Sequence, residues 1–243
     1  MPGSTGLATG VQLDVYSDVI CPWCHLGHRR LQAAIGRVGG DAIERVGGGG
    51  TAPGKAASDE AGPAGIDLRW RAFQLDPHAP AEPGDLSRAI EARYGPGAFD
   101  AMSRRLVTLG AEAGIDYRFD LARRVNTFDA HRLIQWAAAS RPELTGALVD
   151  RLFRAYFTEG ANVADHATLV ALGTDVGLDG TDVAVALASG AGADRVRADR
   201  AEAMEIGITG VPAVVYNGAT IIPGAQDVDT MARVLARLRA KVG

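Results

Sequence analysis

The sequence predicts an α/β fold interrupted by a large all-helical insertion. Three observations support this prediction: a strand–helix–strand pattern near the start, helical periodicity throughout residues 85–189, and a strand hairpin followed by a helix at the end. Hydrophobic residues make up 47% of the 243 residues and charged residues 22%. This composition is typical of a soluble globular protein with a sizeable core.

The first α/β unit begins with a strand at residues 11–17, where β-branched and aromatic side chains partly alternate with polar ones. A helix is predicted from Pro22 to about Val38, because proline suits the first turn of a helix and two glycines follow. Apolar alternation resumes at 66–73, so the two strands are expected to be parallel, with a right-handed crossover. The Gly-rich stretch 47–65 between them shows no apolar periodicity, and we expect a flexible surface linker there.

The middle of the chain is predicted to be helical. Glycine and proline breaks divide it into expected helices at 85–94, 98–113, 127–140, 143–157, 165–177 and 180–188. We therefore expect an inserted helical subdomain at 85–189, within an α/β domain formed by residues 11–84 and 190–243.

The α/β pattern returns near the end of the chain. A helix is expected at about 193–206, strands at 213–217 and 220–222, and a closing helix at about 228–241. Asn217-Gly218 is typical of a tight two-residue hairpin, so these last two strands are predicted to be antiparallel.

The only two cysteines, Cys21 and Cys24, flank Pro22 and Trp23 at the start of the first predicted helix. The first N–H groups of a helix have no partner inside it, and the helix dipole adds partial positive charge there. A thiol at this place ionises more easily, and the thiolate is the reactive form. Two thiols this close can also form a disulfide, so exchange with another sulfur compound is the leading hypothesis.

Three other interpretations of the cysteine pair stay open. A zinc site needs four ligands, and the chain has no second cysteine pair. His25 and His28 could complete a set of four ligands. However, His25 falls on a different face of the helix from Cys24. We therefore expect no metal. A structural disulfide would close a very small loop and constrain the unfolded chain little. Inert core cysteines are the remaining alternative.

Two further positions are candidate parts of the site. Val211-Pro212 precedes a predicted strand, and a cis bond there would turn the backbone of Val211 toward an extended substrate, although the residues alone favour an ordinary trans bond. Asp14 lies inside the first strand, where burial would raise its pKa and could let it relay protons for Cys24. The alternative for Asp14 is a solvent-exposed position.

Charge and composition limit the function and the compartment. The net charge of −4 argues against nucleic-acid and anionic-membrane surfaces, and no apolar run is long enough to span a bilayer. The first ten residues lack the basic and apolar regions of a secretory signal, so we expect a cytoplasmic protein. Thiols are kept reduced in the cytoplasm, where a lone Cys-x-x-Cys pair is more often catalytic than structural.

Taken in order, these motifs resemble the DsbA-like branch of the thioredoxin superfamily, and within it the FrnE-type oxidoreductases. The matching stretches are 17–24, 70–75, 126–127 with 130–133, 207–213 and 223–226. The resemblance implies a thioredoxin-like fold in which Cys21 attacks and forms a mixed disulfide, and Cys24 resolves it. It also implies that Pro212 is a cis proline facing the pair, and that Val211 offers backbone hydrogen bonds to the substrate.

The resemblance carries further expectations. It implies that Pro22 and Trp23 tune the redox properties of the pair, and that Asn126 and His131 lie near the active-site cleft; His131 could equally be a core histidine. The expected partner is a thiol or disulfide substrate, protein or small molecule. No cofactor is expected besides the redox-active disulfide, although glutathione could serve as a co-substrate, and a homodimer stays open.

Two competing functions remain. The first is a glutathione-dependent isomerase or transferase acting on a small aromatic metabolite, as in a related branch that has serine in place of the first cysteine; Cys21 argues against it. The second is a non-catalytic binding module that keeps only the fold.

Overall fold

The computed structural model describes residues 10–39, 42–44 and 65–242. Its five-stranded sheet has the order β2 (Ala42–Glu44), β3 (Ile66–Ala72), β1 (Val11–Ser17), β4 (Ala213–Tyr216) and β5 (Ala219–Pro223). β1 and β2 run parallel to β3, whereas β4 runs antiparallel to β1 and to β5. The predicted parallel unit and the antiparallel hairpin are therefore confirmed.

Three features of the sheet and its connections relate to the remaining predictions. The edge strand β2 has no counterpart among the predicted strands. The linker predicted at 47–65 lies outside the described residues except for Gly65, whose carbonyl accepts a hydrogen bond from the amide of Val11. The hairpin turn has positive φ at both Asn217 (49°) and Gly218 (75°), the left-handed conformation that such a turn requires and that these two residue types tolerate.

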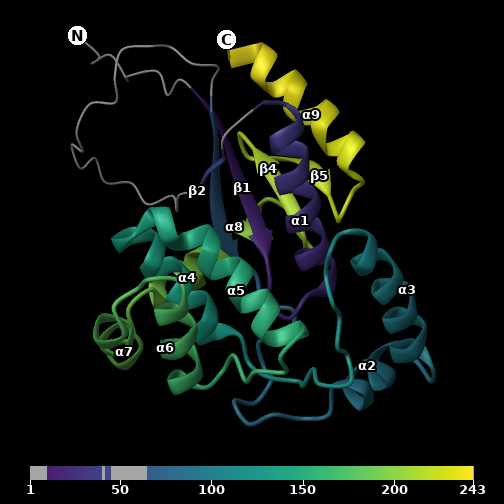
Figure 1. Ribbon diagram of the computed structural model, residues 1–243, viewed down its shortest axis with the longest axis vertical. Helices are drawn as coiled ribbons and strands as arrows, with labels where there is room; N and C mark the ends of the chain where they lie inside the picture. Colours follow the sequence, from purple (N-terminus) through teal and green to yellow (C-terminus); the bar gives the residue numbers. More distant parts are fainter. Residues whose placement is uncertain (1–9, 40–41, 45–64, 243) are drawn as a thin grey trace.

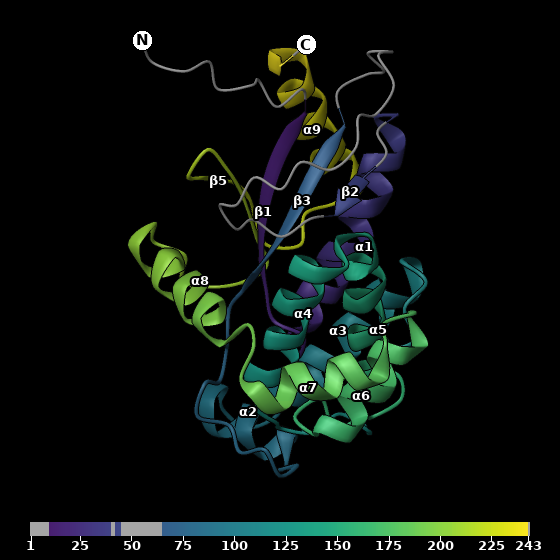
Figure 2. The ribbon, with the colours of Figure 1, turned by 90° about the vertical axis from the view of Figure 1, so that its left-hand side faces the viewer.

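Helices cover both faces of the sheet (Figures 1 and 2). α1 (Pro22–Arg37) and α9 (Val228–Val242) pack against each other on one face, and α8 (Ala193–Glu205) lies on the opposite face. Successive side chains of β1 point to opposite faces of the sheet and so reach both helical layers. Leu13 and Val15 join the core beneath α1, whereas Tyr16 packs against Ala203 of α8.

The segment between β3 and α8 is helical, as predicted, and every helix begins and ends within two residues of its expected bounds. It forms α2 (Leu86–Tyr94), α3 (Ala98–Glu112), α4 (Phe128–Ser140), a short 3₁₀ turn (Pro142–Leu144), α5 (Thr145–Phe157), α6 (His166–Asp175) and α7 (Gly180–Ser189). Asp85, Asp165 and Asp179 cap α2, α6 and α7, because their carboxylates accept hydrogen bonds from first-turn amides.

These helices lie at one end of the sheet (Figure 1) and share a single hydrophobic core with it. That core joins Leu13 of β1 and Leu26 of α1 to Leu133 of α4 and Phe153 of α5. The division into a main domain and an inserted subdomain stays a prediction. None of the described helices combines the length and the apolar character that crossing a lipid bilayer requires.

Candidate active site

The two thiols lie where β1 ends and α1 begins. Cys21 is the N-cap residue of α1, with extended backbone (φ −90°, ψ 111°), and Pro22 begins the helix. The carbonyl of Cys21 accepts hydrogen bonds from the amides of Cys24 (2.9 Å) and His25 (3.2 Å). Both thiols are free, and only 3% of Cys21 and 1% of Cys24 is exposed. The turn thus holds both sulfurs at the helix end whose amides have no partner within the helix.

A loop from the other end of the chain faces Cys21. The Cys21 thiol donates a hydrogen bond to the carbonyl of Val211, with Sγ and O 3.7 Å apart, and the Val211–Pro212 peptide bond is cis. Pro212 also approaches α1 closely, since a Cβ added at Gly27 would lie 3.0 Å from Pro212 Cγ. Glycine at position 27 therefore allows this approach. The structure brings together the dithiol, Val211 and Pro212, which the sequence treats as separate motifs.

Cys24 is held as a neutral thiol. Burial raises its pKa well above the ordinary value, and so does its hydrogen bond with Cys21. Two groups act in the opposite direction by hydrogen bonding to the sulfur: the backbone amide of Asp18 and the hydroxyl of Ser17. In the reduced protein Cys24 therefore keeps its proton at neutral pH, although donors that can stabilise its thiolate are already in place.

A buried carboxylate just before the dithiol joins three segments of the chain. Asp18 is 0% exposed; its Oδ2 accepts a hydrogen bond from the amide of Leu75 (2.7 Å), and its Oδ1 lies 3.2 Å from Nε2 of the buried His131. These contacts tie the turn after β1 to the loop after β3 and to α4. Sequence reasoning missed this role of Asp18, although an acidic residue directly before the apolar pair Val19-Ile20 was the available cue.

Asn126 has a different role from that of His131. Its Nδ2 donates hydrogen bonds to the carbonyls of Pro77 (3.2 Å) and Ala79 (2.9 Å), and its Oδ1 accepts one from the amide of Phe128 (2.8 Å). Asn126 therefore fixes the loop after β3 against the start of α4. Neither cysteine is among its hydrogen-bond partners.

Aromatic side chains support the other side of the dithiol turn. The His25 ring stacks in parallel on Phe153 (centroids 4.9 Å apart) and packs edge-on against Tyr117, whose hydroxyl donates to the carbonyl of Pro22 (2.6 Å). Burial lowers the pKa of His25 to about 3, and His28 adds to the effect. His25 is thus a neutral member of an aromatic wall that it forms with Phe153 and Tyr117.

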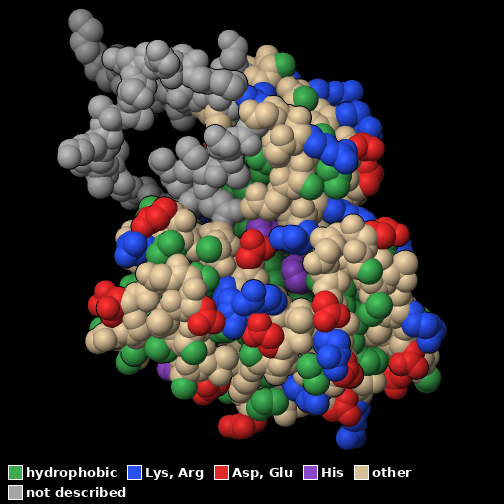
Figure 3. Space-filling model, viewed as in Figure 1, with side chains coloured by type: hydrophobic (Ala, Val, Ile, Leu, Met, Phe, Trp, Pro, Cys, Tyr) green, Lys and Arg blue, Asp and Glu red, His purple; other side chains and the backbone are tan. Residues whose placement is uncertain are grey.

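A cavity of about 800 Å³ lies beside this wall, lined by His25 and by charged residues that include Arg29, Asp150, Arg151 and Arg154. Figure 3 shows histidine side chains in the hollow at the centre of this face, with basic and acidic side chains around them. Across the described ranges, no three His, Cys, Asp or Glu side chains are placed to hold a metal ion.

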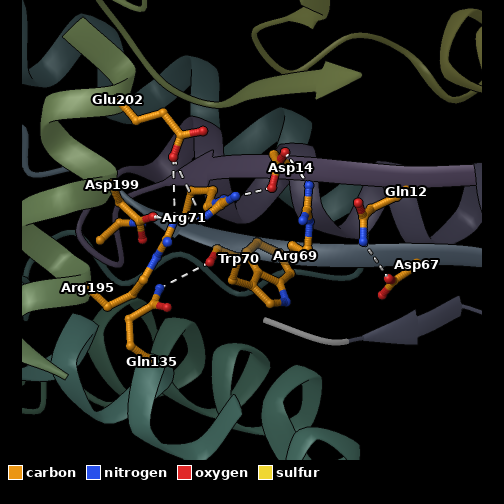
Figure 4. A network of polar contacts seen from close by, with 11 residues as sticks. Gln12, Asp14, Asp67, Arg69, Trp70, Arg71, Gln135, Arg195, Asp199 and Glu202 are labelled. Atoms are coloured by element: carbon orange, nitrogen blue, oxygen red, sulfur yellow. Dashed lines mark hydrogen bonds and ion pairs between the residues drawn. The ribbon is translucent and has the colours of Figure 1, made fainter. Parts of the chain in front are cut away.

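The role considered for Asp14 needs correction. Asp14 shares its side of β1 with Tyr16 and so faces α8, whereas Cys24 belongs to the core on the α1 side. Both carboxylate oxygens are occupied, Oδ1 by Arg71 Nε (2.7 Å) and Oδ2 by Arg69 Nη2 (2.8 Å), as Figure 4 shows. A carboxylate bound in this way on the opposite face of the sheet is not placed to relay protons for Cys24.

The ion-pair network around Asp14 instead fastens α8 to the sheet (Figure 4). Arg71 Nη1 donates to Asp199 Oδ1 (3.0 Å), and the amide of Ala72 donates to Asp199 Oδ2 (3.0 Å). Asp199 belongs to α8, which leads directly into the loop that ends at Pro212. The network therefore helps to position the loop that faces Cys21.

The fold and this site define a class of protein: a thioredoxin-like fold with a Cys-x-x-Cys helix start and a cis-proline loop opposite. The family model described as the DSBA-like thioredoxin domain matches residues 12–236, so the chain belongs to this family of DsbA-like oxidoreductases.

Solved structures with the same fold extend across nearly the whole chain. A probable DsbA oxidoreductase from Streptomyces coelicolor is 29% identical, with a TM-score of 0.77, covering 95% of this chain and 91% of that one. A 2-hydroxychromene-2-carboxylate isomerase is 18% identical, with a TM-score of 0.63 and coverage of 95% and 97%. The cytosolic disulfide reductase DsbM from Pseudomonas aeruginosa, solved with glutathione, is 20% identical, with a TM-score of 0.59 and coverage of 96% and 97%. The last two show the fold alone.

Proposed function

We propose that this protein is a thiol–disulfide oxidoreductase that works through the Cys21–Cys24 pair. The observation that carries the proposal is the geometry of the dithiol. Two free thiols share the start of α1, and the Cys21 sulfur faces the Val211 carbonyl beside the cis proline. The fold is shared with an isomerase, so the fold cannot assign the reaction; the second thiol in hydrogen-bond contact with the first favours redox exchange.

In the reducing direction, the reaction takes two steps. The Cys21 thiolate attacks one sulfur of a substrate disulfide, which forms a mixed disulfide and releases the other sulfur as a thiolate. Cys24 then attacks the Cys21 sulfur, forms the Cys21–Cys24 disulfide and releases the second substrate thiolate. The two protons of the protein thiols end on the two released thiols, and the oxidising direction is the reverse sequence.

The surroundings of the two sulfurs fit these different tasks. Cys24 is the more buried thiol and has a raised pKa, so it stays protonated until the mixed disulfide makes the neighbouring Cys21 sulfur open to attack. The Ser17 hydroxyl and the Asp18 amide then stabilise its thiolate. The bonds of Asp18 to Leu75 and His131 keep that amide in place, which makes Asp18 and His131 positioning residues.

The remaining site residues bind the substrate or tune the pair. When a substrate replaces the Cys21 thiol as the partner of Val211, the backbone of Val211 can pair with an extended chain, and Pro212 holds this loop against α1. Pro22 and Trp23 separate the two sulfurs and influence their redox poise. We also propose that the protein belongs to the FrnE-type branch and works in the cytoplasm. Its reaction needs no bound cofactor and uses glutathione as a co-substrate.

The test is insulin-disulfide reduction by dithiothreitol with two matched variants. C21S is expected to lose the activity, because it removes the attacking sulfur while keeping a side chain of similar size. C24S is expected to accumulate mixed disulfides with substrate, visible by mass spectrometry. Circular dichroism checks that both variants fold. Unchanged activity in C21S would refute the proposal, and glutathione-dependent turnover that survives in C24S would point to the isomerase or transferase alternative.

A further inference from the structure

A basic side chain lies over an aromatic ring next to the dithiol. The guanidinium of Arg105, on α3, sits over the ring of Trp23 with its central carbon 5.2 Å from the ring centroid. Arg105 is exposed and Trp23 is half-buried. Stacking on an aromatic ring leaves the guanidinium N–H groups free to bind a carboxylate edge-on. A fixed positive charge is therefore placed next to the residue that separates the two sulfurs.

A second cation lies on the same side of α1. Trp23, Gly27 and Arg30 recur at spacings of four and three residues, so they share one face of the helix. Gly27 meets Pro212 and Ala225, which places this face toward the cis-proline loop. Arg30 is half-buried, and its Nη1 donates to the carbonyl of Ala225 (3.0 Å). Within the described part of the chain, neither Arg30 nor Arg105 forms an ion pair.

A cavity continues from this face between α1, α3 and the start of α9. It has a volume of about 570 Å³, and its lining includes Arg29, Arg30, Leu109, Glu112 and Asp227. Leu109 is one helical turn beyond Arg105, so the cavity begins close to the Arg105–Trp23 stack. Its size is typical of pockets for small ligands.

One acidic residue of the cavity is engaged in a helix cap, and the other lies well along α3 from Arg105. The carboxylate of Asp227 accepts hydrogen bonds from the amide and the hydroxyl of Thr230, both at 2.8 Å, and so caps the start of α9. Glu112 lies at the far end of α3, nearly two helical turns after Arg105. The lining of the cavity thus holds two cations, Arg29 and Arg30, and two carboxylates, and Arg105 adds a third cation one helical turn before Leu109.

We propose that the groove between α1 and α3 selects small disulfides and thiols that carry carboxylates, with Arg105 and Arg30 as the residues that bind the carboxylates. This inference rests on the proposed redox function and names its substrate class. The Arg105–Trp23 stack and Arg30 hold the anionic part of the substrate while its sulfur meets Cys21. One reductive half-reaction converts the Cys21–Cys24 dithiol and one substrate disulfide into the Cys21–Cys24 disulfide and two carboxylate-bearing thiols, so atoms and electrons balance.

The experiment compares three disulfides of different charge with the reduced protein. Oxidised glutathione is anionic, cystamine is cationic, and hydroxyethyl disulfide is neutral. The quantity measured is the second-order rate constant for oxidation of the dithiol by each charged disulfide, divided by that for the neutral one, which removes effects on the dithiol itself. In R105Q the glutathione ratio is expected to fall about fivefold and the cystamine ratio to rise, as the loss of one surface charge predicts. High salt is expected to shrink both differences.

Two further variants separate charge at this position from other effects. R105K keeps the charge and is expected to retain most of the glutathione ratio. R104Q removes a neighbouring exposed arginine that forms no cation–π contact within the described part of the chain, and both ratios are expected to stay at the wild-type values. Unchanged ratios in R105Q, or equal shifts in R104Q, would overturn the inference while leaving the redox proposal intact. A wild-type protein that reduces none of the three disulfides would overturn the redox proposal, and the inference with it.

Discussion

The aromatic wall beside the dithiol predicts a loss of stability in mild acid. His25 is only 6% exposed, packed between Phe153 and Tyr117, and burial lowers its pKa to about 3 from the ordinary value of 6.5. The folded protein therefore keeps this imidazole neutral under conditions in which the unfolded chain binds a proton. The contribution of neutral His25 to the free energy of unfolding is complete above pH 6.5 and is lost progressively as the pH falls toward 3.

The size of this loss follows from the two pKa values. At pH 5 the unfolded chain gains about 2 kcal/mol from protonating this histidine, and the folded protein gains almost nothing. Urea unfolding at pH 7.5 and pH 5 measures the change in the free energy of unfolding. His25→Phe keeps an aromatic ring in the stack and removes the titration, so its loss of stability between the two pH values is expected to be about 2 kcal/mol smaller than that of the wild type.

A second histidine provides the control for this experiment. His78 is exposed on the loop after β3, and His78→Phe is the same substitution outside the aromatic wall. This variant is expected to lose as much stability between pH 7.5 and pH 5 as the wild type does. If His25→Phe also loses as much as the wild type, the aromatic wall does not keep His25 neutral and the reasoning fails.

Two further substitutions test the packing around the dithiol. Asp18→Ala leaves the amide of Leu75 and the buried His131 without this partner and is expected to lower the free energy of unfolding by about 3 kcal/mol, measured in urea. A loss below about 1 kcal/mol would contradict the role assigned to this carboxylate. Gly110→Ala would drive a Cβ into the ring of Tyr117, so it is expected to cost about 1–3 kcal/mol of stability. The helical control Gly36→Ala, whose added Cβ meets no atom within 4 Å, is expected to be neutral or stabilising in the same urea unfolding assay, and equal losses in both glycine variants would contradict this account.

Local sequence patterns predicted most of the fold because each pattern has a local physical cause. The hairpin follows from Asn217-Gly218, which tolerate the positive φ of a tight turn, and α1 begins at Pro22, where a missing N–H costs nothing. The strand β2 was missed because three residues beside glycines are too few to show alternation. Pairing with β3, rather than local propensity, produces that strand.

The candidate site was only partly predictable, because its contacts join distant parts of the chain. Cys21 and Cys24 stand together in the sequence, whereas Asp18 and His131 are 113 residues apart and meet only in the folded protein. The incorrect role of Asp14 has the same origin. Alternation along a strand shows that neighbouring residues face opposite sides, but it does not show that α8 and Arg71 cover the side of Asp14. The stack of Arg105 on Trp23 likewise depends on how α3 packs beside α1.

The most direct test of the redox proposal is a titration of the protein with mixtures of reduced and oxidised glutathione. At each ratio, the reaction is stopped by acid and the oxidation state of the two cysteines is read by mass spectrometry. The account predicts one transition with a two-electron slope, in which the dithiol converts to the Cys21–Cys24 disulfide and little glutathione adduct accumulates. Thiols that stay reduced at every ratio, or a stable glutathione adduct in place of the internal disulfide, would contradict it.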